Sequence, residues 1–472
     1  MIVPVAFHTY FALRGFPEVA AHTFVLPGII SVVAGACLKR DYVSPPIDDR
    51  QAMMLCALGW IIVSAVGALP FCLGIQMSFI DAYFETVSGF TTTGITMLGG
   101  LDELPYSILF WRAFIQWLGG LGILTFFLAV LYTGGSAHRL FSAESHKVFS
   151  KRPAPSIFRT LRILWLIYAA YTVIITLLLV LQGMSLFDSA CHSMTALSTG
   201  GYSPHDLSIA YYSTHPEQFP YYIWMEYTLI LGMVLGGMNF FVHFRLISEG
   251  ISALWDNLEM KLFWFIVVGS TALIFFERLL KPTELDLHTL FRASLFQVTS
   301  ILTTTGFGTE DIAANGLYPA ASRQILLLLM VIGGCVGSTG GGIKVLRVGV
   351  LCKMLHRQVK RLIWGHRAVH PVVVDGEPIP DEELHRISAL FFAWMGLLTI
   401  GSLVSALLSP HSAFASASGM FSALGNIGPC FIPTPDMALL HPLIKIVYTF
   451  GMLAGRLEIL PLLLLFSPST WK

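Results

Sequence analysis

A short hydroxyl-and-glycine motif occurs four times along this chain, each time directly after a short apolar stretch. The four copies are Thr92-Thr93-Gly94, Ser198-Thr199-Gly200, Thr304-Thr305-Gly306 and, in altered form, Asn426-Ile427-Gly428. Their glycines lie 106, 106 and 122 residues apart. One such tripeptide carries no information. Four at nearly constant spacing predict one structural unit that is repeated four times around a common axis.

The composition indicates an integral membrane protein. Hydrophobic residues make up 55% of the chain and charged residues only 12%, whereas a soluble domain contains about 25% charged residues. The formal net charge is zero, so no nucleic-acid partner is implied. The seven cysteines show neither CxxC spacing nor the density of a disulfide scaffold, and we interpret them as small buried residues.

The apolar stretches predict an all-α fold. A helix needs about 20 apolar residues to cross a bilayer, and the stretches that qualify are roughly 17–38, 51–74, 107–133, 161–182, 220–247, 262–280, 320–352, 384–408 and 441–466. Shorter apolar stretches lead into the motifs, at 79–90, 186–197, 289–301 and 412–424. We interpret these as re-entrant half-helices. Each pseudo-symmetric repeat is then a helix, a pore half-helix, a filter loop and a second helix, and the four repeats surround one central pore.

This organisation predicts a division of the chain into seven parts. The predicted parts are an N-terminal extra transmembrane region (1–50), repeat 1 (51–133), a cytosolic loop (134–160), repeat 2 (161–247), repeat 3 with a glycine-rich intramembrane segment (262–352), a second cytosolic loop (353–383) and repeat 4 (384–472).

The distribution of charge predicts the orientation in the membrane. The loops 39–50, 134–160, 245–261 and 353–386, together with Lys472, contain 17 lysines and arginines, and the stretches around the motifs contain three. By the positive-inside rule, the motifs face outward. The motif-side stretches also contain 12 acidic residues, which predict a negative vestibule that concentrates cations at the outer mouth.

The motifs have the composition of a cation filter. Glycine adopts backbone angles that other residues avoid, so such a loop can turn its carbonyl oxygens toward an axis. A ring of carbonyls can replace the hydration shell of potassium. The hydroxyls of the first three motifs either supplement these carbonyls or hydrogen-bond within a tight turn. Because the motif is repeated, we favour the filter and predict that its ion-binding residues are the twelve residues of the four tripeptides.

The segment 333–342 is the second candidate site. Its six glycines each disfavour a helix by about 1 kcal/mol relative to alanine. A phosphate-binding loop is excluded because no GK[ST] ending and no preceding strand are present. We predict a break in the membrane helix on the cytosolic side of the filter, with Gly337, Ser338, Thr339, Gly340, Gly341 and Gly342 obstructing the pore. Close helix packing through small residues is the alternative.

Arg456 is a charge in the middle of an apolar segment. A central charge costs roughly 2.5–3.5 kcal/mol on insertion, so we expect it to face a cavity or a partner. It forms either an electrostatic barrier in the pore or a structural ion pair. Lys344 is expected to extend toward the membrane surface. The sequence contains no HExxH or GxSxG motif and therefore predicts no enzyme.

Taken together, these stretches resemble the TrkH/TrkG family of bacterial potassium uptake proteins, in the superfamily that includes KtrB and the plant HKT transporters. The resemblance rests on SGFTTTGIT (88–96), STGGYS (198–203), TTTGFG (303–308), GGCVGSTGGGIKVLR (333–347), ALGNIGP (423–429) and GRLEILPLLLLFSPSTW (455–471).

The resemblance implies a homodimer in the cytoplasmic (inner) membrane, with a pseudo-fourfold pore in each subunit and a cytosolic TrkA-like nucleotide-binding ring as regulator. It also implies that 333–342 is an intramembrane gating loop and that Arg456 lies close to it on the pore wall. HKT members that favour sodium carry serine in the first filter, so Gly94 points to K+ as the transported ion. A sodium-selective or weakly selective transporter is the alternative.

Two departures from the family pattern remain. Cys430 stands where the family usually has glycine. The family has two helices before the first repeat, whereas only 17–38 is clearly of full length here. Either the first helix starts abruptly near Met1 or the chain begins late.

Overall fold

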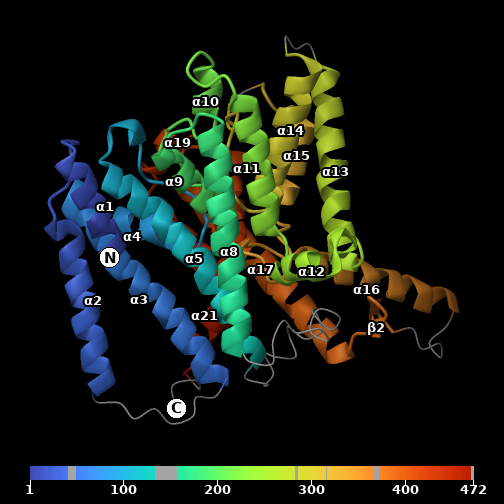
Figure 1. The fold of residues 1–472 in the computed structure, drawn as a ribbon. Coiled ribbons are helices and arrows are strands. Elements are labelled where there is room, and N and C mark those ends of the chain that lie inside the picture. Colours follow the sequence, from blue (N-terminus) through green and yellow to red (C-terminus); the bar gives the residue numbers. More distant parts are fainter. Residues whose placement is uncertain (41–48, 133–156, 282–284, 315, 365–370, 469–472) are drawn as a thin grey trace.

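The computed structural model describes the chain except residues 41–48, 133–156, 282–284, 315, 365–370 and 469–472. The described part consists almost entirely of helices, most of which run side by side (Figure 1). Most of the cytosolic loop predicted over 134–160 lies outside the described residues, as does part of the loop predicted over 353–383. A two-stranded antiparallel hairpin, β1 (Val373–Val374) and β2 (Glu377–Pro378), lies within the second of these regions.

Two helices precede the first predicted repeat. The first, α1 (Ile2–Leu13), has only 12 residues, and α2 (His22–Arg40) has 19. Aromatic stacking joins α1 to α5 (Tyr106–Tyr132), because the Phe7 ring lies 3.8 Å from Phe110 and the Phe11 ring lies 4.8 Å from Tyr106. The N-terminal region is therefore packed against the helices that follow it.

Four short helices precede the four motifs. They are α4 (Phe79–Phe90), α9 (Leu186–Leu197), α14 (Leu287–Leu302) and α18 (Ala413–Gly425). Each begins at a side-chain cap, since Ser78, Ser185, Asp286 and Ser412 each accept a hydrogen bond from the backbone N–H three residues later. Such caps satisfy backbone donors at a helix start. The bounds agree within two residues with the short helices expected from the sequence.

Two helices flank each short helix, and all of them except the flanking helix after α14 are longer than the short helix between them. The flanking helices are α3 (Asp49–Ile75) and α5 for α4, α8 (Ile157–Leu181) and α11 (Tyr222–Gly237) for α9, α13 (Leu258–Leu279) and α15 (Ala320–Leu329) for α14, and α17 (Asp381–Leu408) and α20 (Pro442–Arg456) for α18. Large apolar side chains are exposed on the outer helices, among them Leu55, Leu177, Phe265 and Leu407. This surface is suited to lipid rather than to water.

Three of the predicted spans are broken. The expected helix 220–247 bends by 103° between α11 and α12 (Phe240–Glu249), where the Asn239 side chain caps α12. The glycine-rich segment separates α15 from α16 (Val345–Trp364), as its glycines predicted. In the last span, Glu458 and Ile459 have positive φ between α20 and α21 (Leu460–Leu465), just before Pro461.

The breaks reduce the number of full-length spans. Five of the described helices are long and apolar enough to cross a membrane, or six if the bent pair α11–α12 is one span. The sequence predicted nine, because hydropathy does not register the change of direction in the three broken spans and because the predicted span 17–38 contains only the shorter apolar helix His22–Leu38. Arg456 consequently lies at the C-terminal end of α20 and not at the middle of a helix.

Candidate cation-binding site and its adjoining loop

The four motif loops have the same backbone conformation. The residue with left-handed geometry after each short helix is Thr92, Thr199, Thr304 or Asn426, with φ of 53°, 53°, 59° and 56°. Two residues later comes a glycine with positive φ, which is Gly94, Gly201, Gly306 or Gly428. Left-handed angles are unfavourable for residues with a side chain. Their recurrence at four matching positions indicates one backbone turn used four times.

The second loop has a different register from the one its tripeptide suggested. Its positive-φ glycine is Gly201, whereas the motif selected Gly200. The matching glycines are then 107, 105 and 122 residues apart. Gly200 takes the middle position, which corresponds to Thr93, Thr305 and Ile427, and Ser198 corresponds to Thr91. Two adjacent glycines are indistinguishable in the sequence, so only the backbone angles assign the register.

The loops contact one another in cyclic order. A Cβ atom added to Gly94 would lie less than 3.0 Å from the Gly200 oxygen, and one on Gly201 equally close to the Thr305 oxygen. The same holds for Gly306 and the Ile427 oxygen, and for Gly428 and the Thr93 oxygen. Each loop thus lies against the next and the fourth against the first. Each of the four middle-position carbonyls lies too close to the glycine of a neighbouring loop for that glycine to carry a side chain.

Hydroxyl groups hold the chain directly after the glycine in the first three loops and at the glycine itself in the fourth. Ser88 donates to the Ile95 carbonyl (2.6 Å), Thr195 to that of Tyr202 (2.8 Å) and Ser300 to that of Phe307 (2.6 Å). In the fourth loop, the Ser422 hydroxyl accepts from Gly428 N (3.0 Å). These residues lie outside the motifs that the sequence predicted as the site. Their signal is a serine or threonine four residues before each left-handed position.

The motif hydroxyls bond mainly to protein atoms. Those of Thr93 and Thr305 bond to Thr91 and Thr303, and that of Thr93 also accepts from the Asn426 amide. The Ser198 hydroxyl bonds to the Thr195 carbonyl at 3.4 Å. These hydrogen bonds agree with a role of the hydroxyls within the tight turn, which was one of the two roles that the sequence left open for them. The Thr92 hydroxyl is buried and has no partner among the described residues.

The glycine-rich segment lies against three of the four loops. Gly341 N donates to the Thr304 hydroxyl (2.9 Å), and the hydroxyls of Thr199 and Thr339 lie 3.2 Å apart. A Cβ on Gly341 would collide with the Asn426 side chain. The segment therefore touches the left-handed residues of the second, third and fourth loops.

The break in α11 receives this segment. Cys335 N donates to the Gly237 carbonyl (2.9 Å) and Thr339 N to that of Gly236 (3.1 Å). The Thr339 hydroxyl also donates to Leu197 O (2.9 Å) and Gly236 O (3.0 Å). Where a helix ends, its last carbonyls lack intrahelical partners, and here the glycine-rich segment supplies them.

Two buried cations are bonded to the same segment. Arg456 donates to Thr339 O (2.5 Å) and to Gly119 O (3.0 Å), and it forms no ion pair with any carboxylate in the described part of the chain. Lys344 donates to Gly340 O, so it turns into the protein and does not extend to the membrane surface as expected. The structural ion pair that was one of the two predictions for Arg456 is therefore not formed among the described residues. The nearby Glu458 pairs with Arg347 (2.7 Å).

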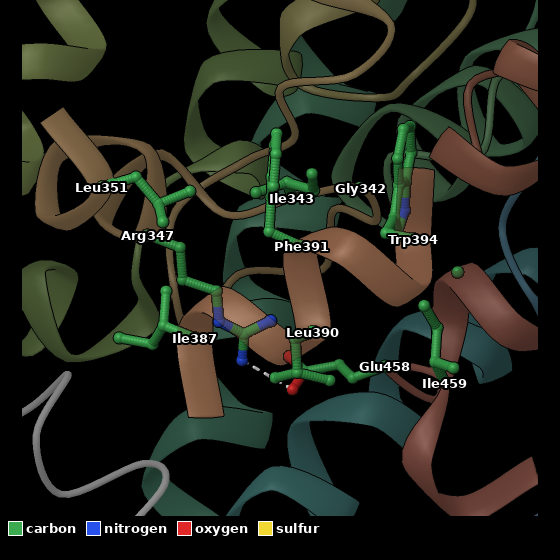
Figure 2. Close-up of a pocket in the computed structure, with 11 residues that line it drawn as sticks. Gly342, Ile343, Arg347, Leu351, Ile387, Leu390, Phe391, Trp394, Glu458 and Ile459 are labelled. Carbon is green, nitrogen blue, oxygen red and sulfur yellow. Dashed lines mark hydrogen bonds and ion pairs between the residues drawn. The ribbon is translucent and has the colours of Figure 1, made fainter. Parts of the chain in front are cut away.

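A small cavity of about 20 Å³, enough for about one water molecule, borders the far end of this segment. Figure 2 shows residues that line it, among them Gly342 and Ile343 of the segment and Phe391 and Trp394 of α17. The Arg347–Glu458 ion pair lies at its edge (Figure 2). The end of the segment and the α20–α21 break therefore adjoin the same space.

Several acidic residues of the predicted vestibule are neutralised. Glu85 is fully buried and pairs with Arg112 (3.0 Å), while it also accepts from Met97 N (2.8 Å). Asp81 pairs with Lys445 (2.5 Å), and Glu310 with Arg278 (2.9 Å). These three carboxylates therefore act within the protein and contribute little to a negative field at the mouth.

Comparison with known proteins agrees with this architecture. The model of the TrkH family of cation transport proteins matches residues 20–472. This chain belongs to the TrkH family. Among its relatives is the Trk system potassium uptake protein TrkH of Salmonella typhimurium, which is 33% identical over 95% of this chain and 96% of the relative. The Trk system potassium uptake protein TrkG of Escherichia coli is 31% identical, over 95% and 91%.

A solved structure shares the fold of this family member over its whole length. The crystal structure of the potassium transporter TrkH from Vibrio parahaemolyticus matches with a TM-score of 0.83 at 29% identity. The match covers 100% of this chain and 98% of that one. The all-α membrane fold expected from the sequence is therefore confirmed.

Proposed function

We propose that this protein is a potassium-uptake subunit that conducts K+ through a filter of backbone carbonyls. The cyclic contact of the four loops is the observation that carries the proposal. It supports a ring in which the carbonyls of Thr93, Gly200, Thr305 and Ile427 take equivalent positions around one axis. The relatives named as potassium uptake proteins support the choice of ion.

The chemistry required of such a site is dehydration of a monovalent cation. Carbonyl oxygens replace the water ligands without contributing a full negative charge, which lets the ion leave as well as enter. The filter comprises the twelve predicted residues together with Gly201, which takes over the position first given to Gly200. Glycine at each of the four crowded positions lets the loops approach one another closely.

We propose further that residues 337–342 and Arg456 form a gate. The segment lies against three of the four loops and is anchored by the α11 carbonyls. The Arg456 charge, held by Thr339 O, opposes a cation that leaves the filter on this side.

The remaining parts of the proposal concern the assembly. We propose a homodimer in the cytoplasmic membrane, with the filters outward and a cytosolic TrkA-like nucleotide-binding subunit as regulator. K+ is the transported ion, no other cofactor and no nucleic acid are required, and the protein is not an enzyme. The relatives named as parts of a Trk system support this assembly.

Replacement of Gly94 tests the filter. A serine side chain there would collide with the Gly200 carbonyl, so Gly94→Ser should lower the ratio of rubidium to sodium uptake in proteoliposomes by about tenfold, which corresponds to about 1.4 kcal/mol. Gly99→Ser is the matched control, because a Cβ at Gly99 meets nothing within 4 Å. An unchanged ratio in Gly94→Ser would contradict the filter. Equal rubidium and sodium uptake by the unmodified protein would favour a weakly selective transporter.

A further inference from the structure

A second set of equivalent residues lies one helical turn before the hydroxyl anchors. Seven residues before each left-handed residue stand Glu85, His192, Gln297 and Gly419. The first three side chains are fully buried. Each position is three residues before a hydroxyl anchor, so it shares that anchor's helix face. These side chains are therefore directed toward the chain that follows the filter glycine.

In the first two loops this position braces the returning chain. Glu85 accepts hydrogen bonds from the Thr96 hydroxyl (2.9 Å) and from Met97 N (2.8 Å). His192 Nε2 bonds to the Ser203 hydroxyl (3.0 Å). Thr96 and Ser203 are themselves equivalent, because each lies four residues after the left-handed residue. A polar side chain on the short helix thus meets a hydroxyl beyond the glycine.

In the third loop the hydroxyl partner is replaced by Gly308. Both amide atoms of Gln297 are buried without a hydrogen-bond partner among the described residues, and so is the hydroxyl of Thr309, the next residue along. The fourth loop is filled differently. A Cβ on Gly419 would collide with the Tyr448 hydroxyl, which donates to Ser416 O (3.2 Å). The third loop therefore has a polar brace residue whose protein partner is missing.

We propose that Gln297 is a positioning residue for the third filter loop and acts through ordered water shared with Thr309. An amide offers both a donor and an acceptor, and buried polar groups without protein partners are commonly satisfied by internal water. This inference rests on the proposed filter. The third filter loop is then held by a water molecule that can exchange, whereas the first and second loops are held by the side chains of Glu85 and His192.

Supplying the missing hydroxyl tests the brace. Gly308 has no positive φ, and a Cβ there meets only Glu310 O at 3.3 Å, so Gly308→Ser recreates the His192–Ser203 pairing with a small adjustment. We expect Gly308→Ser to melt about 2 °C above Gly308→Ala. In the Gln297→Met background this advantage should disappear, which is the signature of a direct interaction in a double-mutant cycle.

Ion uptake provides a second readout. Gln297→Met should lower the ratio of rubidium to sodium uptake by roughly three- to tenfold, the loss expected for one hydrogen bond, and Gly308→Ser should preserve the ratio. Equal melting temperatures of Gly308→Ser and Gly308→Ala would overturn the brace even if the unmodified protein is selective for rubidium. Absence of selective rubidium uptake by the unmodified protein would instead overturn the proposed filter. If Gln297→Met does not fold, the Gly308 pair still decides the question.

Discussion

At the scale of single residues, backbone angles carry information that residue types do not. Gly200 and Gly201 are both compatible with a filter motif, and only Gly201 has the positive φ shared with Gly94, Gly306 and Gly428. A Cβ on Gly201 would meet the Thr305 carbonyl, whereas one on Gly200 would meet the side chain of Gln116. Gln116 in turn donates to Gly200 O (2.7 Å) and accepts from Tyr202 N (3.0 Å), so it braces the second loop from outside.

His205, in the loop after the second motif, should make stability depend on pH. Burial lowers its pKa, but hydrogen bonds and the charges of Asp188 and Asp102 raise it more, so the pKa lies above the ordinary value of 6.5. The protonated form is therefore favoured by folding. Its contribution is fully present below pH 6.5 and is lost as the pH rises through the raised pKa.

We expect the melting temperature of the unmodified protein to fall more between pH 6 and pH 9 than that of His205→Gln. The geometry supports an effect of His205 itself on stability, because its Nδ1 lies 2.5 Å from Asp102 and its ring stacks on that of Tyr211 at 3.7 Å. Thermal unfolding of the purified protein at several pH values measures this. Parallel curves for the two proteins would show that His205 does not contribute.

At the scale of elements, broken helices make the contacts that continuous helices would have prevented. The sequence predicted the break at 333–342 from its glycines but not the breaks after Gly237 and Arg456. Gly236, Gly237 and Asn239 were available signals, since a glycine pair followed by a capping residue is typical of a helix boundary. The reason for the break is tertiary, because the α11 carbonyls bond to Cys335 and Thr339, about 100 residues further along the chain.

Weakening this contact should increase basal transport. Thr339→Val keeps the shape of the side chain and removes the hydroxyl that donates to Leu197 O and Gly236 O. With about 1 kcal/mol for each hydrogen bond, we expect basal rubidium flux to rise roughly five- to thirtyfold, and deletion of 338–342 to raise it further. Thr399→Val is the matched control, since that exposed hydroxyl bonds only within α17. If neither change raises the flux, the segment is not a gate.

At the scale of the whole molecule, the orientation can be measured directly. After Cys37 and Cys352, both exposed, are replaced by serine, Glu103→Cys should react with a membrane-impermeant maleimide on intact cells. Lys360→Cys should react only after permeabilisation, as the positive-inside rule predicts. Both positions are exposed in the structure. The opposite labelling pattern would invert the proposed topology.

The sequence by itself determined the membrane class, the four short helices, the repeated turn and the glycine-rich break. Each depends on local properties, namely hydropathy, capping residues and the backbone freedom of glycine. Tertiary structure alone decided the register of the second loop, the burial of Glu85 and Lys344, and the bonding of Arg456 to carbonyls. These depend on groups that lie far apart in the chain, such as Gly428 beside Thr93, because a buried polar group must find its partner wherever the fold brings one.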